Sequence, residues 1–206
     1  MLKWLFKKKK IQNESNEVKL EDLTIESRRR SSLFPAFYKR IEEIFKCGNN
    51  NIISCSEFDR AALVHALLFE NAGFSVKIIS NNLTADIFNN RRLAESAEKA
   101  INLQLSVDVI VKGIPEESLF LNMLKKYEDK QSVNLILCDD GGIDCNFEMS
   151  VADNQSYYFC TETGHSIANA KDYEMALKFA KNFNVYKDLI LKSKNLKNLL
   201  AVTDKI

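Results

Sequence analysis

The residues of this chain whose types and spacing can do chemistry are few, and two of them are its only histidines. His165 follows Thr-Glu-Thr-Gly in a segment that predicts a loop, where a histidine beside Glu162 can act as a general base. Cys160 lies close in sequence, and a Cys–His pair is a nucleophile only if the fold brings the two side chains together. His65 lies among leucines on an apolar helix and is predicted to pack in the core or to face a partner.

The cysteines do not predict a metal site. They number five, at positions 47, 55, 138, 145 and 160, and no two are spaced as C-x-x-C. A structural zinc site requires closely spaced pairs of ligands. We therefore expect buried, reduced thiols in a cytosolic protein, with no metal and no cofactor.

The glycines do not form a phosphate-binding loop, because the six of them match neither G-x-G-x-x-G nor G-x-x-x-x-G-K. The helix that begins after Ser56 can still hold an anion through its backbone N–H groups, although Ser56 and Asp59 are explained more simply as helix caps. A nucleotide at the carboxyl ends of the strands, near Ser56, Asn81 and Asn82, is a further possibility.

An uneven charge distribution separates an N-terminal arm from the body of the chain. Residues 1–32 predict a basic, polar and disordered arm, and residues 33–206 predict one folded domain. The apolar side chains around Trp4 stand beside four lysines and predict a weak contact with an anionic membrane surface or with nucleic acid: Lys7, Lys8, Lys9 and Lys10. Apolar residues before the charges are the reverse of a secretory signal. We expect a cytoplasmic protein, with the inner face of the membrane as the place where the arm can bind.

Strands and helices alternate along the body. Short β-branched runs predict four strands, near 51–55, 75–79, 105–111 and 132–138, and apolar residues at helical spacing predict four helices, over 33–47, 56–73, 84–104 and 116–127. After a tight turn at 139–142 come a hairpin of two strands, a long helix and a shorter helix, over 146–152, 156–160, 172–192 and up to about residue 200. This order predicts a three-layer α/β/α sandwich with a mixed, mainly parallel sheet.

One segment has the form of a catalytic motif. Residues 146–153, Asn-Phe-Glu-Met-Ser-Val-Ala-Asp, carry polar side chains at the spacing N-x-E-x-x-x-x-D. The segment resembles the motif H-x-K-x-x-x-x-D of the phospholipase D-like superfamily, which lies on a strand before a turn. The preceding α/β units, the hairpin and the long helix through Phe183 and Tyr186 are also similar to degenerate members of that group. The resemblance covers roughly residues 33–190.

The resemblance implies a fold whose catalytic residues are missing. In the family, the motif histidine attacks a phosphodiester and the motif lysine binds phosphate, and active members need two motif copies. Asn146 stands at the histidine position and cannot act as that nucleophile. Glu148 stands at the lysine position and repels phosphate, while Asp153 keeps the aspartate position.

The resemblance therefore implies a non-catalytic domain that works by binding, in an accessory, sensing or regulatory role. Its partner is expected to be another protein or a second copy of itself. The expected ligand-binding positions are Ser56, Asn146, Glu148, Asp153 and His165.

Two other functions stay open. One is a phosphodiesterase or nuclease that uses His165 with Glu162, Asp153 or Cys160. The other is a nucleotide-binding, Rossmann-like sensor. If residues 146–153 are not a motif, Asn146 and Glu148 are a solvent-facing pair on a strand whose alternate side chains point to the core: Phe147, Met149 and Val151.

Overall fold

The computed structural model describes residues 35–138 and 147–203, and side chains up to residue 193. The chain divides into two units, Met1–Arg40 and Ile41–Ile206. Of the first unit only the helical residues 35–40 are described. The predicted disorder of the arm and its boundary at residue 32 lie outside the described residues and stay predictions.

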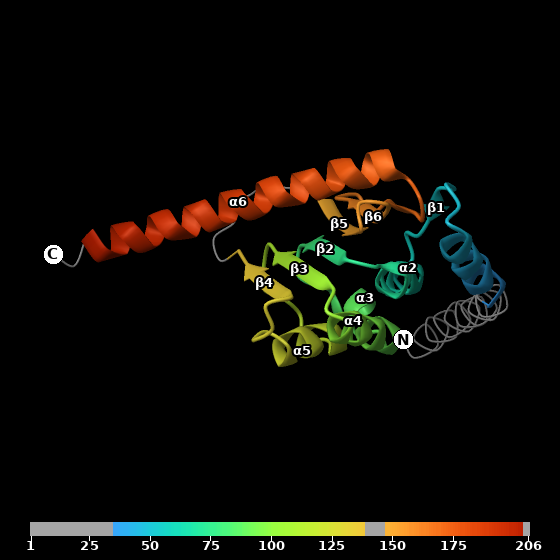
Figure 1. Cartoon of the computed structure of the whole chain (residues 1–206), viewed down its shortest axis with the longest axis horizontal. Coiled ribbons are helices and arrows are strands. Elements are labelled where there is room, and N and C mark those ends of the chain that lie inside the picture. The colour runs from blue at the N-terminus through green and yellow to red at the C-terminus, as the bar shows by residue number, and fades with distance from the viewer. Residues whose placement is uncertain (1–34, 139–146, 204–206) are drawn as a thin grey trace, which may run out of the picture. The chain divides into compact units, whose positions relative to one another are not determined.

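A seven-stranded mixed sheet forms the middle layer of the second unit, in the order β1-β7-β6-β5-β2-β3-β4 (Figure 1). The strands are β1 Ile53–Ser54, β2 Ser75–Ser80, β3 Ser106–Val111, β4 Val133–Leu137, β5 Phe147–Ala152, β6 Ser156–Thr161 and β7 Ser166–Asn169. β2, β3 and β4 pair in parallel. The other four pairings are antiparallel. The predicted α/β class with a mixed sheet is confirmed, but the expected predominance of parallel pairs is wrong.

The antiparallel half of the sheet has a local cause. β5 and β6 are joined by a short turn, and a turn of this length can only join antiparallel strands. Asp153 and Asn154 in this turn both have positive φ, 53° and 56°, which is typical of the tight hairpin turn that the sequence predicts. β7 was not predicted because its four residues show no sustained apolar pattern. β1 pairs antiparallel with β7, so the first predicted strand is not part of a parallel unit.

Helices cover both faces of the sheet, as predicted for a three-layer fold (Figure 1). One face carries α2 Phe58–Asn71, α3 Ala85–Phe88, α4 Arg91–Asn102 and α5 Leu119–Lys126, and the other carries α6 Tyr173–Thr203. The single helix expected over 84–104 is two helices. They part because the Asn90 side chain accepts a hydrogen bond from the Leu93 N–H at 3.1 Å and so begins a new helix. The two helices expected at the C-terminal end are one continuous helix.

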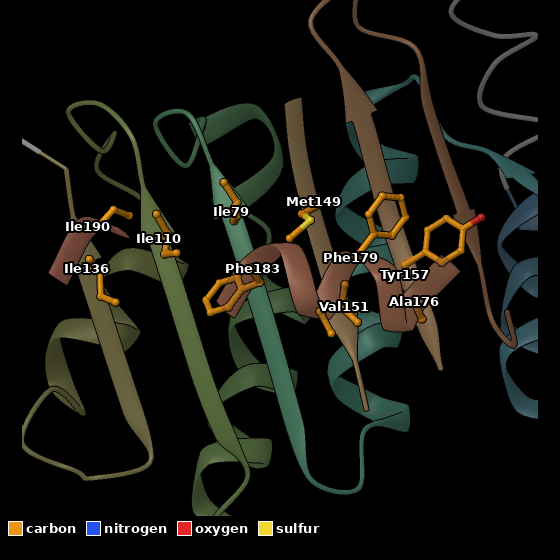
Figure 2. Close-up of a cluster of buried hydrophobic side chains, with 11 residues drawn as sticks. Ile79, Ile110, Ile136, Met149, Val151, Tyr157, Ala176, Phe179, Phe183 and Ile190 are labelled. Carbon is orange, nitrogen blue, oxygen red and sulfur yellow. The ribbon is translucent and has the colours of Figure 1, made fainter. Parts of the chain in front are cut away.

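The core between α6 and the sheet fixes the helix across the strands. Figure 2 shows its side chains, with Phe179 beside Tyr157 at one end and Ile190 beside Ile136 at the other. The Phe179 ring also stacks on Phe159, with centroids 5.0 Å apart. The apolar set comprises Ile79, Ile110, Ile136, Met149, Val151, Tyr157, Ala176, Phe179, Ala180, Phe183 and Ile190.

A polar contact adds to this core. Lys187 of α6 donates to the Asp108 carboxylate of β3 at 2.6 Å, and the Asn134 amide of β4 donates to the same oxygen at 2.9 Å. The side chain of Asp108 is 10% exposed, so the carboxylate depends on these two donors for the hydrogen bonds that water would otherwise give it. The pair therefore holds α6 at one position along the sheet.

His65 belongs to the core on the opposite face and to no site. It is 3% exposed, its Nδ1 lies 2.7 Å from the carbonyl oxygen of Ala61, and its ring packs 4.5 Å from that of Tyr158. Burial lowers the pKa of His65 to about 4, against a hydrogen bond to Ala61 that acts in the other direction. Of the two predicted positions, the packed one is confirmed.

Candidate functional site

The predicted motif begins at the edge of the sheet where β2 and β3 end. Glu148 lies on β5 opposite Cys160 of β6, and β5 runs antiparallel beside β2. Its carboxylate therefore reaches the last residue of β2 and the turn that follows. Asn146 lies outside the described residues, so the motif can be followed in space only from Phe147 onwards.

The Glu148 carboxylate is held by the turn after β2. One of its oxygens accepts from the Ser80 hydroxyl at 3.0 Å and from the Asn81 N–H at 2.8 Å. The Ser80 Oγ in turn accepts from the N–H of Leu83, a residue with a positive φ of 52°. Glu148 is therefore a fixed, half-buried anion that stabilises this turn, and the possibility of a simple solvent-facing residue is wrong.

A pocket of about 380 Å³ opens beside this carboxylate. The described residues that line it include two carboxylates, from Glu148 and Glu162, and neither a lysine nor an arginine. Lys112 lies close by, where its ammonium donates to the carbonyl oxygen of Phe147 at 2.9 Å. The lining residues are Asn81, Phe147, Glu148, Cys160, Thr161, Glu162 and Gly164. The pocket is thus negative where a phosphate site has to be positive.

The thiol in this pocket is not an activated nucleophile. Burial raises the pKa of Cys160, and the negative charge of Glu148 raises it further. Its Sγ lies 3.4 Å from the carbonyl oxygen of Thr161. A reactive cysteine has a lowered pKa and an electropositive environment, and Cys160 has neither.

His165 is exposed in the turn between β6 and β7. Its carbonyl oxygen accepts from the Thr161 N–H at 3.0 Å, and the positive φ of Gly164, 80°, closes the turn. Gly164 and Glu162 line the pocket, whereas His165 does not. Sequence proximity thus brings Glu162 to Cys160 but does not place His165 in the pocket with them.

Asp153 lies at the other end of β5, away from the pocket. It follows Glu148 by five positions along an extended strand, a span of roughly 17 Å. Its carboxylate accepts from three consecutive N–H groups in the turn before β2, those of Gly73, Phe74 and Ser75, the last two at 2.9 and 2.7 Å. The position that matches the motif aspartate is structural here, and the expectation that it binds ligand with Glu148 is wrong.

Ser56 lies at the same end of the sheet as Glu148, two strands further along. Its hydroxyl oxygen accepts from the Ser166 N–H at 3.2 Å, so it ties the start of β7 to the chain after β1. The residue at the cap of α2 is Glu57, with no side-chain capping bond, so the interpretation of Ser56 as the helix cap is wrong. Ser166 pairs with Cys160, and Cys160 pairs with Glu148, so Ser56 stands at the end of one row across the strands, although it does not line the pocket beside Glu148.

The place where a nucleotide phosphate would bind near Asn82 is already occupied by the chain itself. The Glu116 carboxylate accepts from the Asn82 amide at 2.7 Å and, through its other oxygen, from the Ala85 N–H at 2.7 Å. Ala85 is the first residue of α3, so an internal carboxylate takes the anion position at this helix start. Sequence reasoning missed Glu116, because its partners lie more than thirty residues away.

Within 35–138 and 147–203, no group of three or more histidine, cysteine or acidic side chains is placed to hold a metal ion. Among the described cysteines, Cys55 is buried as expected, whereas Cys138 and Cys160 are half-buried and Cys47 is exposed. Cys145, Trp4 and Lys7–Lys10 lie outside the described residues. Across the same part of the chain, no helix combines the length and the apolarity that a membrane span requires.

Known proteins resemble this chain in structure and not in sequence. No protein-family model and no curated protein sequence matches it. The solved structure of TrmBL2, described as an archaeal chromatin protein with a novel mode of DNA binding, is 17% identical, with a TM-score of 0.51. The match covers 86% of this chain and 66% of TrmBL2, so the chain spans slightly less than two thirds of that protein.

The similar structures also include a phospholipase D family member, Nuc from Salmonella typhimurium, and NucT from Helicobacter pylori. Nuc is 12% identical over 65% of this chain and 90% of its own, with a TM-score of 0.44. NucT is 13% identical over 66% of this chain and 93% of its own, with a TM-score of 0.43. Identities this low show a likeness of fold alone.

Proposed function

We propose that this chain is a non-catalytic phospholipase D-like domain that binds a protein partner in an accessory, sensing or regulatory role. The observation that carries the proposal is the fixed carboxylate of Glu148, at the position where the motif of the superfamily has its phosphate-binding lysine. Two donors hold this carboxylate in place, so it cannot turn away from an incoming anion.

Electrostatics oppose a phosphate in this pocket. Two unit charges about 4 Å apart interact by about 4 kcal/mol at the effective dielectric constant of a protein surface. A phosphate oxygen beside Glu148 meets a repulsion of that order, and Glu162 adds to it from the pocket rim. The ammonium of Lys112 offsets part of this repulsion, but it already donates to the carbonyl oxygen of Phe147.

The same charges favour a basic partner. The pocket is large enough for one long side chain, and the faces of its carboxylates suit an arginine or a lysine. Phe147 also contributes to the lining, while its ring packs against Phe159 and Tyr186. We therefore expect the partner to present a basic residue to this pocket.

An activity assay tests the non-catalytic part of the proposal. Hydrolysis of bis-p-nitrophenyl phosphate and of DNA is measured with and without divalent metal, for the wild type, Glu148→Gln and His165→Ala. Glu148→Gln keeps the shape and the acceptor oxygen and removes only the charge. We expect no turnover by any of the three. Turnover by the wild type that Glu148→Gln abolishes would refute the proposal, and turnover that only His165→Ala abolishes would establish the enzyme alternative.

A binding assay tests the charge of the pocket. Arginine amide is titrated into the isotopically labelled protein, and the amide signals of Asn81 and Gly164 are followed. We expect saturable shifts that weaken in Glu148→Gln, and no comparable shifts with inorganic phosphate. Shifts with phosphate and none with arginine amide would overturn the predicted chemistry of the partner.

The basic arm is a separate part of the proposal. Its lysines predict a contact with a polyanion, either an anionic membrane or nucleic acid. The likeness to TrmBL2, which is described as a DNA-binding chromatin protein, makes DNA the first probe to try. We expect salt-sensitive binding to DNA or to anionic liposomes that is lost when residues 1–10 are deleted. Binding that survives the deletion would refute a role for the arm.

A further inference from the structure

The sheet has two edges that differ in length and chemistry. At one edge β1 has two residues, too short to template another strand. At the other edge β4 has five, Val-Asn-Leu-Ile-Leu, with no proline and no charged side chain. Folded proteins normally protect a long edge with charges, prolines or bulges, because an open edge recruits further strands. β4 carries none of these protections.

The backbone groups on the outer side of β4 can be identified from its pairing with β3. Cys138 donates to the Val111 carbonyl at 2.8 Å, and the Ser132 carbonyl accepts from Val107 at 2.7 Å. Alternate residues of a strand in a parallel ladder direct both backbone groups to the same neighbour. The backbone N–H and C=O groups of the even-numbered residues of β4 therefore point towards β3. Those of Val133, Leu135 and Leu137 point away from it.

The outward groups are unequal in what they already bind. The Val133 N–H donates to the Lys130 carbonyl at 2.9 Å. In the described part of the chain, the N–H groups of Leu135 and Leu137 have no partner strand, since β4 pairs with β3 alone. The strand thus presents two donors, and the carbonyls between them, along one line.

α6 continues past this edge. Among the α6 side chains that the structure describes, Ile190 is the last one in the core and lies beside Ile136 of β4, while the helix runs on to Thr203 (Figures 1 and 2). The thirteen residues from Leu191 to Thr203 span about 20 Å at 1.5 Å per residue. Neighbouring strands of a sheet lie about 4.8 Å apart, so this length of helix can cover about four further strands.

The geometry points to a homodimer in which β4 of one copy pairs antiparallel with β4 of a second copy. Leu135 is the middle residue of β4, so a two-fold axis through it matches the outward groups of both strands. The N–H of Leu135 then donates to the Leu135 carbonyl of the partner copy, and the N–H of Leu137 donates to the Val133 carbonyl. The two sheets become one continuous sheet.

A second copy fits this edge better than an isolated peptide because of α6. An axis perpendicular to the joined sheet places both α6 helices on the same face and antiparallel, with each reaching over the other copy. Leu189 and Leu191 flank Ile190 and are 50% and 42% exposed, so apolar surface is present where the helices would meet. An edge strand alone buries too little for a stable dimer, which needs about 1,200 Å² or more, and the helices supply the remainder.

The test measures the mass of the full chain in solution across a dilution series. We expect twice 23.6 kDa at high concentration for the wild type and for Leu135→Val, which keeps the N–H group. Leu135→Pro removes one outward donor and leaves the bonds to β3 intact, because proline is tolerated at an outward-facing edge position. We expect it to be a monomer with the circular dichroism spectrum of the wild type.

Hydrogen exchange keeps the proposal testable if Leu135→Pro does not fold. In the wild type, the amides of Leu135 and Leu137 should be protected at high concentration and lose protection on dilution, while the amide of Ile136 stays protected. A wild type that is a monomer throughout, a dimeric Leu135→Pro, or unprotected Leu135 and Leu137 amides at high concentration would each overturn the proposal. The dimer does not rest on the acidic pocket, so a monomer that binds arginine amide refutes only the dimer.

Discussion

Replacing Asp153 separates a structural role for the motif aspartate from a catalytic one. Asp153 has two structural features. Its carboxylate accepts hydrogen bonds from the N–H groups of Gly73, Phe74 and Ser75, and its backbone has a positive φ of 53°. Asp153→Gly removes the carboxylate and accepts the positive φ. Asp153→Ala removes the carboxylate and is strained at that φ. Asp153→Asn keeps an acceptor oxygen and tolerates the conformation.

The exposure of the three N–H groups sets how much free energy of unfolding each variant loses. A hydrogen bond to a charged group contributes about 1.5–3 kcal/mol, but the N–H groups of Gly73 and Phe74 are exposed and can turn to water. The half-buried Ser75 N–H bears most of the cost. We expect Asp153→Gly to lower the free energy of unfolding by about 2–4 kcal/mol. Asp153→Ala should lose about 1 kcal/mol more because of its φ, and Asp153→Asn should lose least.

Urea unfolding followed by circular dichroism gives these free energies, and the m-values show whether the transition stays two-state. The order Asn, Gly, Ala from mildest to most severe is the specific expectation. An Asp153→Ala variant as stable as the wild type would refute the structural role. A glycine variant less stable than the alanine variant would refute the strain argument.

The remaining predictions concern the two cores and the thiols. Lys187→Met leaves the buried Asp108 carboxylate without its cation and should lower the free energy of unfolding by about 3 kcal/mol. The double variant with Asp108→Asn should recover much of this loss. A Lys187→Met variant as stable as the wild type in urea would contradict the prediction. Burial lowers the pKa of His65 to about 4 from 6.5 in the unfolded chain, so the unfolded state binds more protons between these values. Stability should therefore be full above pH 6.5 and fall by up to about 3 kcal/mol as the pH drops towards 4; His65→Gln should lose this part of the pH dependence, and an unchanged profile would show that other groups cause it. Burial raises the pKa of Cys55 to about 12, so iodoacetamide should label the exposed Cys47 and spare Cys55 in the native protein, as peptide mass spectrometry can show.

Much of the fold follows from local pattern. The runs that became β2 and β3 are rich in valine and isoleucine, and such β-branched runs predict strands. What local pattern could not show is how the strands pair. Ser54 and Ile167 lie more than a hundred residues apart, yet their pairing decides that β1 is antiparallel. The break between α3 and α4 depends on one side-chain cap at Asn90, which periodicity does not detect.

The site was less predictable than the fold. The sequence spacing from Glu148 to Asp153 suggested one site, but a separation of five positions along an extended strand places the two side chains at opposite ends of β5. The partners that define Glu148, namely Ser80 and Asn81, are nearly seventy residues away and had no signal of their own. Glu162 and Cys160, two of the residues expected to act with His165, line one pocket because a tight turn after β6 keeps sequence neighbours close, but His165 itself does not line it.

The order of the strands also has a consequence for how the chain is synthesised. β2 and β5 are central neighbours, but the paired residues Val76 and Ala152 are 76 positions apart. During translation, the parallel half from β2 to β4 leaves the ribosome first, and the side of β2 that β5 will occupy stays open until the hairpin emerges. Closing so long a loop is slow, because the chain loses conformational entropy before the contacts between β2 and β5 can stabilise the closed state. α6 emerges after both halves and contacts β2, β5 and β6, so the native contacts across the sheet are completed only when this helix has also left the ribosome.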